Sequence, residues 1–147
     1  MVELSPAFLG TVRLQTALMG LTLAFKERYG DSTFEVTKAY VEHMGRMIGS
    51  QLKETGGITG SNVSAIERVY HAWLDPAYMP HQPDIQVDGN VVRVTRTSPM
   101  LCPAMVVAKQ MKLPLDKVCE TVAIPMFRGV AKSVNNEAVH TSTRSPQ

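Results

Sequence analysis

The residues best suited to chemistry in this sequence of 147 residues are its two cysteines, Cys102 and Cys119, which fall in one stretch, 101–120. Pro103 follows Cys102, and this pair predicts a helix with the cysteine at its N-cap and the proline at its first position. The sulfur would then lie among unpaired backbone N–H groups at the positive end of the helix dipole, which favours the nucleophilic thiolate. The alternative, which the residues alone favour, is a small, buried and inert thiol.

Three further residues are candidates for the chemistry of this stretch. Cys119 falls deeper in a helical pattern among apolar neighbours, where an inert core role is expected. Glu120 follows it on another face of the helix and is either a general base or a solvated surface residue. His140 falls in a predicted final strand, from which it could meet the Cys102 region, as a base for a thiol must do.

The sequence carries no recognisable pattern for a metal or a phosphate. It contains no Cys-x-x-Cys, no His-x-x-x-His and no carboxylate cluster, and its Gly-rich loop at residues 56–61 lacks the strand and lysine of a phosphate-binding loop. We therefore expect no metal and no cofactor. Two cysteines without an export signal predict free thiols in a reducing cytoplasm.

The composition narrows the classes of partner. An apolar fraction of 44%, a charged fraction of 19% and a formal charge of +2 are ordinary for a globular domain. Lys and Arg are scattered rather than clustered, so nucleic acid is not an expected partner. Because we find no uninterrupted apolar run of about 18 residues, we expect no membrane partner either.

The elements that must position these residues predict an α+β fold. Helical patterns occupy residues 5–30, 32–55 and 64–76, alternating residues around Asp88-Gly89 predict a β-hairpin over 84–97, and residues 104–111 and 115–127 are again helical. Pro125 should kink or break the last of these helices. We expect one domain, with a helical part at 5–76 and a hairpin, helix and strand part at 84–143. The N-terminal helices would pack on a small antiparallel sheet, with helices inserted between the hairpin and a last strand at 138–143.

The first helix is apolar around much of its circumference. Leu14, Leu18, Leu21 and Phe25 recur at helical spacing, and further apolar residues widen the stripe. Such a helix is either central to the core or half of a contact between subunits. Gly45 and Gly49 in the second helix permit the close approach of another helix. From these features we expect a homodimer or a larger homo-oligomer.

A small-molecule pocket is the second possible site. Tyr70 and Trp73 form an aromatic side on the third helix, and nine methionines are many for this length. Flexible thioethers suit an adaptable core or a pocket for an apolar ligand.

The layout from the hairpin onward, residues 85–143, resembles the L-2-amino-thiazoline-4-carboxylic acid hydrolase family, and more distantly the vinyl-4-reductase-type ligand-binding domains. The pieces that carry the resemblance are a strand ending Val94-Thr-Arg96 that leads to Cys102-Pro103, then residues 115–119, and then Val139-His-Thr141. The family typically has an acidic residue after its second cysteine region, and Glu120 matches it most nearly. A further Cys-containing strand that often ends the family is not included in the sequence up to Gln147.

The resemblance implies a hydrolase that acts on C–N bonds of a small cyclic amidine or related heterocycle. Cys102 would be the nucleophile or a polar anchor, Glu120 or His140 the proton carrier, and Arg96 the partner of a substrate carboxylate. Cys119, Tyr70 and Trp73 would complete the substrate-binding set. The alternative hypothesis is a binding module whose apolar pocket holds a small ligand without catalysis.

Overall fold

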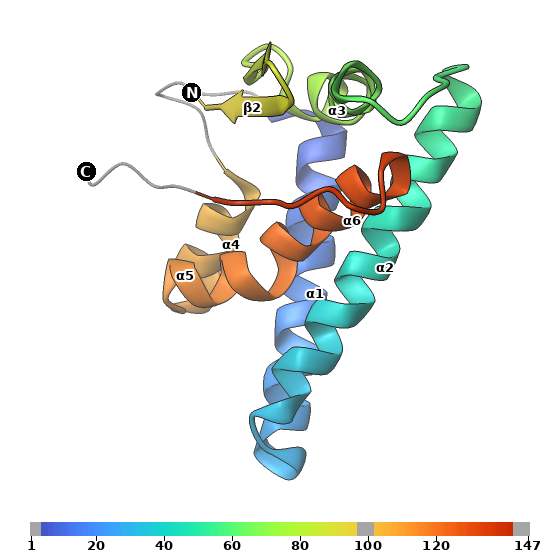
Figure 1. Cartoon of the computed structure of the whole chain (residues 1–147). Coiled ribbons are helices and arrows are strands. Elements are labelled where there is room, and N and C mark those ends of the chain that lie inside the picture. The colour runs from blue at the N-terminus through green and yellow to red at the C-terminus, as the bar shows by residue number, and fades with distance from the viewer. Residues whose placement is uncertain (1–3, 97–101, 143–147) are drawn as a thin grey trace.

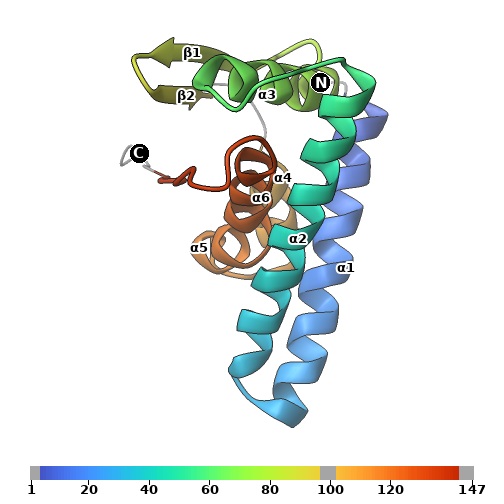
Figure 2. The ribbon, with the colours of Figure 1, turned by 45° about the vertical axis from the view of Figure 1, so that its right-hand side comes forward.

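The computed structural model describes residues 4–96 and 102–142. Its central scaffold is a pair of long antiparallel helices. Helices α4 to α6 pack against one side of this pair, and α3 lies with the hairpin across one end (Figure 1 and Figure 2). In chain order the elements are α1 (Pro6–Tyr29), α2 (Ser32–Thr55), α3 (Val63–Tyr78), β1 (Asp84–Asp88), β2 (Val91–Thr95), α4 (Pro103–Met111), α5 (Leu115–Val118), a π-helix η1 (Cys119–Ala123) and α6 (Ile124–Val134).

The predicted α+β class and the hairpin are confirmed. β1 and β2 pair antiparallel with Ile85 opposite Val94, and Gly89 turns the chain at a φ of 61°. Of the N-terminal helices, α3 packs on this sheet. The expected last strand is not found in its described part, because residues 138–142 adopt no strand conformation. There His140 packs on the ring of Phe127 instead.

The start of α1 is tied to the end of α3. Ser5 caps α1: its Oγ accepts a hydrogen bond from the Phe8 backbone N–H at 3.1 Å. The same hydroxyl donates to the carbonyl oxygen of Ala77 at 2.7 Å. The prediction that α3 ends at Pro76 is wrong, since the helix continues to Tyr78. These two extra helical residues bring Tyr78 beside Phe8, with ring centroids 5.7 Å apart.

The buried face of α1 differs from the one that the leucine spacing predicts. Leu14, Leu21 and Phe25 are exposed, and the core takes up a neighbouring stripe of Phe8, Val12, Gln15, Met19 and Thr22. Apolar residues surround α1, so no single stripe dominates its sequence, and packing against α2 and α4 decides which side is covered. A polar glutamine and a threonine are thereby placed in the core.

Helices α2 and α6 meet at a contact made by glycines. Gly45 and Gly49 of α2 face Gly129 and Ser133 of α6, and a Cβ built on Gly129 would meet the Glu42 carbonyl oxygen and lie 2.9 Å from the Gly45 Cα. The predicted close approach of another helix is thus confirmed, and that helix is α6 of the same chain. Beside the contact, Lys132 Nζ lies 3.2 Å from Glu42 Oε1.

The α-helical pattern is interrupted just before Pro125. Residues 119–123 form the π-helix η1, which ends with a bond from the Ile124 N–H to the Cys119 carbonyl oxygen, five residues earlier. Pro125 has no N–H to donate, so it cannot make the hydrogen bond to the Thr121 carbonyl oxygen that a regular helix would contain. The change to the wider π-helical turn lies directly before this proline. The chain then continues directly into α6, which begins at Ile124.

The free ends of α1 and α2, with the turn that joins them, extend beyond the other helices (Figure 1 and Figure 2). Several large apolar side chains of this pair are exposed, namely Leu21, Phe25, Tyr29, Val36, Tyr40 and Met47. Self-association stays a prediction that these residues favour. Gly45 and Gly49 no longer contribute to it, because α6 covers them.

By length and composition α1 is also able to cross a membrane, with a mean hydropathy of 1.3 over its most apolar window. Our expectation of no membrane partner relied on an uninterrupted apolar run, and α1 meets the length and hydropathy requirement without one. This is weak evidence for a membrane, because a core helix or a signal sequence meets the same test.

Replacing Gly129 by alanine should lower the free energy of unfolding by about 1–3 kcal/mol or more, because the new Cβ collides with the α2 backbone. Gly10→Ala is the matched control, since Gly10 is a helical glycine with no atom within 4 Å of the position that a Cβ would take. It should be neutral or stabilising by up to ~1 kcal/mol through helix propensity. Urea denaturation of both variants checks the prediction, and equal stabilities would contradict the tight α2–α6 contact.

Candidate functional site

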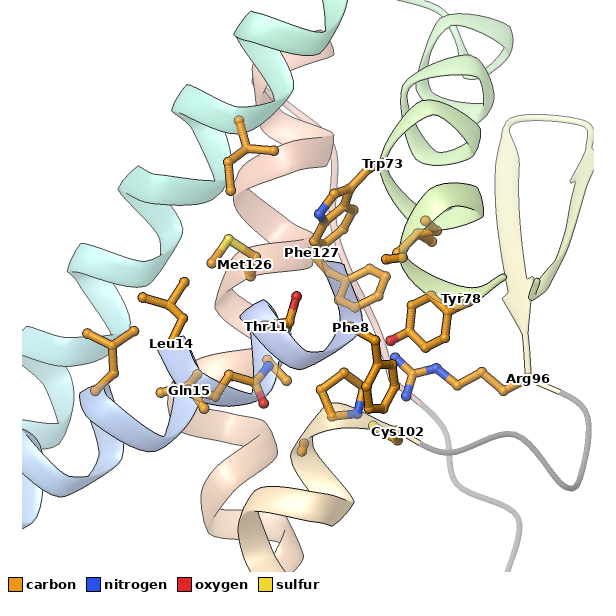
Figure 3. Close-up of a pocket in the computed structure, with 18 residues that line it drawn as sticks. Phe8, Thr11, Leu14, Gln15, Trp73, Tyr78, Arg96, Cys102, Met126 and Phe127 are labelled. Atoms are coloured by element: carbon orange, nitrogen blue, oxygen red, sulfur yellow. The ribbon is translucent and has the colours of Figure 1, made fainter. Parts of the chain in front are cut away.

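A pocket of about 90 Å³ opens between α1, the end of α3, the start of α4 and the junction of η1 with α6. Its wall is mostly apolar, and Figure 3 shows the side chains that line it. They are Phe8, Thr11, Leu14, Gln15, Leu18, Ile48, Trp73, Leu74, Ala77, Tyr78, Arg96, Cys102, Pro103, Ala104, Val122, Ala123, Met126 and Phe127. The predicted residues Arg96, Cys102 and Trp73 therefore share one pocket, although they come from three separate parts of the chain.

Arg96 brings a positive charge into this apolar pocket. It follows β2, and its guanidinium group points toward Tyr78 and Phe8 (Figure 3). The guanidinium carbon lies 5.5 Å from the centroid of the Tyr78 ring and 5.9 Å from that of Phe127. Both distances are those of cation–π contacts. Although much of the residue is exposed, its charged end lies over two aromatic faces.

Arg96 stays positively charged in this setting. Burial lowers its pKa, but attraction by Tyr78 and by Cys102, a side-chain hydrogen bond to Cys102 and attraction by Cys119 raise it by more. The pKa of Arg96 therefore lies above its ordinary value. No ion pair found among residues 4–96 and 102–142 gives Arg96 a carboxylate partner. Its cationic group is available to an anionic ligand.

Cys102 occupies the predicted N-cap of α4. Its backbone is extended, with φ −104° and ψ 133°, and Pro103 follows at the first helical position. Its side chain makes no capping hydrogen bond to α4, and the half-buried residue lines the pocket. The thiol thus lies beside the Arg96 guanidinium rather than on the backbone N–H groups of the helix.

An aromatic cluster forms one wall of the pocket. The Trp73 and Phe127 rings meet edge to face with centroids 4.8 Å apart, and Tyr70 lies 6.0 Å from Phe127. The Tyr70 hydroxyl donates a hydrogen bond of 3.3 Å to the Phe127 carbonyl oxygen. Tyr70 does not itself line the pocket; it supports Trp73 and Phe127, which do.

Burial keeps the tyrosines of this region neutral. It raises the pKa of Tyr70 to about 12. It also raises the pKa of Tyr78 to about 12, against the opposing effect of Arg96. At neutral pH the Tyr78 hydroxyl is a neutral hydrogen-bonding group, and among the described residues that line the pocket Arg96 carries the charge.

The structure does not bring the remaining predicted residues into the pocket. Cys119 is half-buried in η1 and contributes to the electrostatic environment of Arg96. Glu120 is exposed on η1 and faces away from the lining set. His140 reaches the pocket only indirectly, through Phe127, whose ring centroid lies 5.7 Å from its own.

The sequence analysis did not name Phe8, Gln15, Tyr78 or Phe127 as site residues, although all four line the pocket. Tyr78 lay beyond the predicted end of α3, and Gln15 lay off the predicted stripe of α1. The sequence did contain one usable signal for Gln15. It recurs with the apolar residues Phe8, Val12 and Met19 at spacings of three and four residues, which places it on the same face of the helix. Phe127 carried no local pattern, because its partners are Arg96, Tyr70 and Trp73, which are distant in the sequence.

Comparisons with protein-family models, with curated proteins and with solved structures give no match to this chain. The resemblance to the thiazoline carboxylate hydrolases therefore stays a prediction that depends on the residues quoted for it.

The pKa of His140 should be lower than 6.5, because the ring is partly buried and Arg128 lies near it. The neutral imidazole then favours the folded state above pH 6.5, and this contribution is lost as the pH falls through the folded-state pKa. Arg128→Gln should move the pKa of His140 back up by removing the repulsion. NMR titration of the His140 ring checks both, with Arg93→Gln as the control, because Arg93 is an exposed arginine that is not among the groups that shift the pKa of His140. A His140 pKa at or above 6.5 would contradict this environment.

Proposed function

We propose that this chain binds a small molecule that has an anionic group, most simply a carboxylate, on an apolar or aromatic body. The observation that carries the proposal is the Arg96 guanidinium, which lies over Tyr78 and Phe127 at a pocket with a mostly apolar wall. Arginine matches carboxylates with two parallel N–H donors, and apolar surroundings strengthen that pairing. The aromatic wall of Trp73 and Phe127 would accept the body of the ligand.

The pocket volume limits the size of the ligand. About 90 Å³ is several times the ~30 Å³ that one water occupies in the liquid. It is well below the ~300–1,000 Å³ of pockets that enclose drug-sized ligands. A single small ring with an acid group is therefore the class of ligand that we expect.

The residues that line the pocket favour binding over hydrolysis. Within the described chain, no Asp, Glu or His belongs to that lining. General acid–base catalysis needs a group of suitable pKa within hydrogen-bond reach of the reacting atoms. Glu120 is exposed, and His140 contacts Phe127 without lining the pocket. Neither predicted proton carrier is therefore placed to reach a ligand in the pocket.

Arg96→Met should weaken binding of furan-3-carboxylate at least tenfold, because a hydrogen-bonded charge of this kind is worth about 1.5–3 kcal/mol. Trp73 is the single tryptophan of the chain and lines the pocket, so its fluorescence reports occupancy directly. Furan-3-methanol, which lacks the charge, should bind more weakly to the unaltered protein, and Arg96→Met should leave its affinity unchanged.

Arg93→Met is the matched control, because Arg93 is an exposed arginine three residues earlier in β2 and does not line the pocket. It should leave the affinity for furan-3-carboxylate unchanged. Equal losses in the Arg93 and Arg96 variants would mean that overall charge, not this pocket, attracts the acid. An unaltered protein that binds neither furan compound would overturn the proposal.

A thiol hydrolase is the second candidate, and the position of Cys102 beside Arg96 favours it. In that function Arg96 would hold the carboxylate of a cyclic amidine acid, and the Cys102 sulfur would attack the amidine carbon. The ring C–N bond to that carbon would then break, and its nitrogen would leave as an amine that takes up the thiol proton. Water would then replace the sulfur on that carbon and release the opened product. The same pocket and the same anionic group serve both candidates, and the difference is whether Cys102 reacts.

In a Cys119→Ser background, iodoacetamide should alkylate Cys102 faster than it alkylates free cysteine at pH 7 if Cys102 is a nucleophile. Arg96→Met should remove that advantage. The purified protein should also consume 2-amino-thiazoline-4-carboxylate, and Cys102→Ser should not. A Cys102 that reacts no faster than free cysteine, in a protein that leaves this acid intact, would eliminate the hydrolase and leave the binding function.

A further inference from the structure

The pocket has a polar group with no partner in the wall contributed by α1. Gln15 is 7% exposed and is one of the buried polar residues of the core. Its Oε1 is fully buried and finds no hydrogen-bond partner among the described residues. A buried acceptor in this state costs stability, so most such groups in folded proteins have partners.

The other buried polar residues show that this fold satisfies such groups elsewhere. The Thr22 hydroxyl, on the same stripe of α1, bonds to the Leu18 carbonyl oxygen and to Thr37 Oγ1, both at 2.6 Å. The Thr121 hydroxyl donates to the Lys117 carbonyl oxygen at 2.7 Å. Gln15 differs from both because it lines the pocket, where a ligand can supply what the protein does not.

The amide of Gln15 faces the same space as the guanidinium of Arg96. Figure 3 shows Gln15 reaching into the pocket from α1 and Arg96 reaching in from the opposite side. One side chain carries an acceptor and the other a cation with hydrogen-bond donors. Because Oε1 has almost no accessible surface, the Gln15 amide must turn about its terminal torsion for Oε1 to meet a ligand. A ligand that satisfies both needs an N–H or O–H group as well as its anionic group.

We propose that Gln15 is a specificity-determining residue of this pocket, whose Oε1 accepts a hydrogen bond from an N–H or O–H group on the body of a small acid held by Arg96. The ligand class is thereby narrowed from small apolar acids to small acids with a second, donating polar group. This inference rests on the proposed binding function. It adds a discrimination that Arg96 and the aromatic wall do not provide, because a site built to accept a hydrogen bond rejects a ligand that lacks the donor.

A trapped water is the alternative partner for Gln15. A buried water typically makes about three hydrogen bonds. The lining of the pocket is largely apolar and offers a water few additional partners. A ligand donor that displaces such a water gains the bond to Oε1 and fills the remaining space.

Two ring acids of nearly equal size test the inference. Pyrrole-3-carboxylate has a ring N–H, and furan-3-carboxylate has a ring oxygen in its place. The unaltered protein should bind the pyrrole acid at least tenfold more tightly by Trp73 fluorescence. Gln15→Leu should abolish this preference while keeping the furan acid bound, and Arg96→Met should weaken both acids. Gln51→Leu is the matched control, since Gln51 is an exposed glutamine of α2 outside the pocket.

Each result bears on a separate claim. Equal affinity of the unaltered protein for the two acids overturns the role of Gln15 and leaves Arg96 as the anion site. A preference for the furan acid means that Gln15 presents its N–H, and it overturns the assignment of a donating ligand. Binding of neither acid overturns the proposed function together with this inference.

A stability measurement tests Gln15 without any ligand. Because Gln15→Leu removes a buried acceptor that has no partner, the melting temperature of the ligand-free protein should rise, whereas Gln51→Leu should leave it nearly unchanged. A lower melting temperature for Gln15→Leu would show that Gln15 Oε1 already has a hydrogen-bond partner inside the protein. That result would overturn the assignment of Gln15 as a ligand-binding residue.

Discussion

The contact between Gly45 of α2 and Gly129 of α6 sets the spacing on which the rest of this structure depends. It lets two helix backbones approach so closely that no side chain fits between them. Backbone contact at this distance leaves little freedom for α6 to slide or rotate on α2. The Glu42–Lys132 ion pair lies beside it, but is partly exposed and adds little by comparison. The position of α6 on α2 is therefore determined mainly by the close contact that these glycines allow, and only to a small extent by ion pairing between side chains.

Fixing α6 also fixes one wall of the pocket. Met126 and Phe127 lie on α6, directly before the glycine contact, and both line the cavity. Phe127 in turn meets Trp73 of α3, the Arg96 guanidinium and the His140 ring. One aromatic side chain thus joins the helical part of the chain, the end of the hairpin and the C-terminal segment. The charged end of Arg96 is held over a rigid surface, which suits recognition of a small acid more than adaptation to many ligands.

Local signals in the sequence predicted the features that depend on neighbouring residues. Cys102-Pro103 begins a helix as expected, and Asp88-Gly89 turns the hairpin, because capping and turn chemistry involve only a few adjacent positions. The face of α1 was not predictable in the same way, because its apolar residues surround the helix and packing selects among them. For that reason Gln15 was overlooked. Glu120 was chosen for its proximity in sequence to Cys119, and the π-helix directs it to solvent.

The π-helix η1 holds one residue more than a regular helical turn. The wider turn absorbs this residue, so the chain before and after it keeps nearly the rotation about the helix axis that a regular turn would give. Removing one residue between Cys119 and Ile124 should therefore restore a regular turn and leave Val118 and α6 in nearly the same orientation. The same deletion inside α6 would rotate the residues on one side of it by about 100°, because each residue of an α-helix corresponds to that rotation. For changes of length, η1 is therefore the tolerant part of this region, and α6, which α2 holds in place, is the sensitive part.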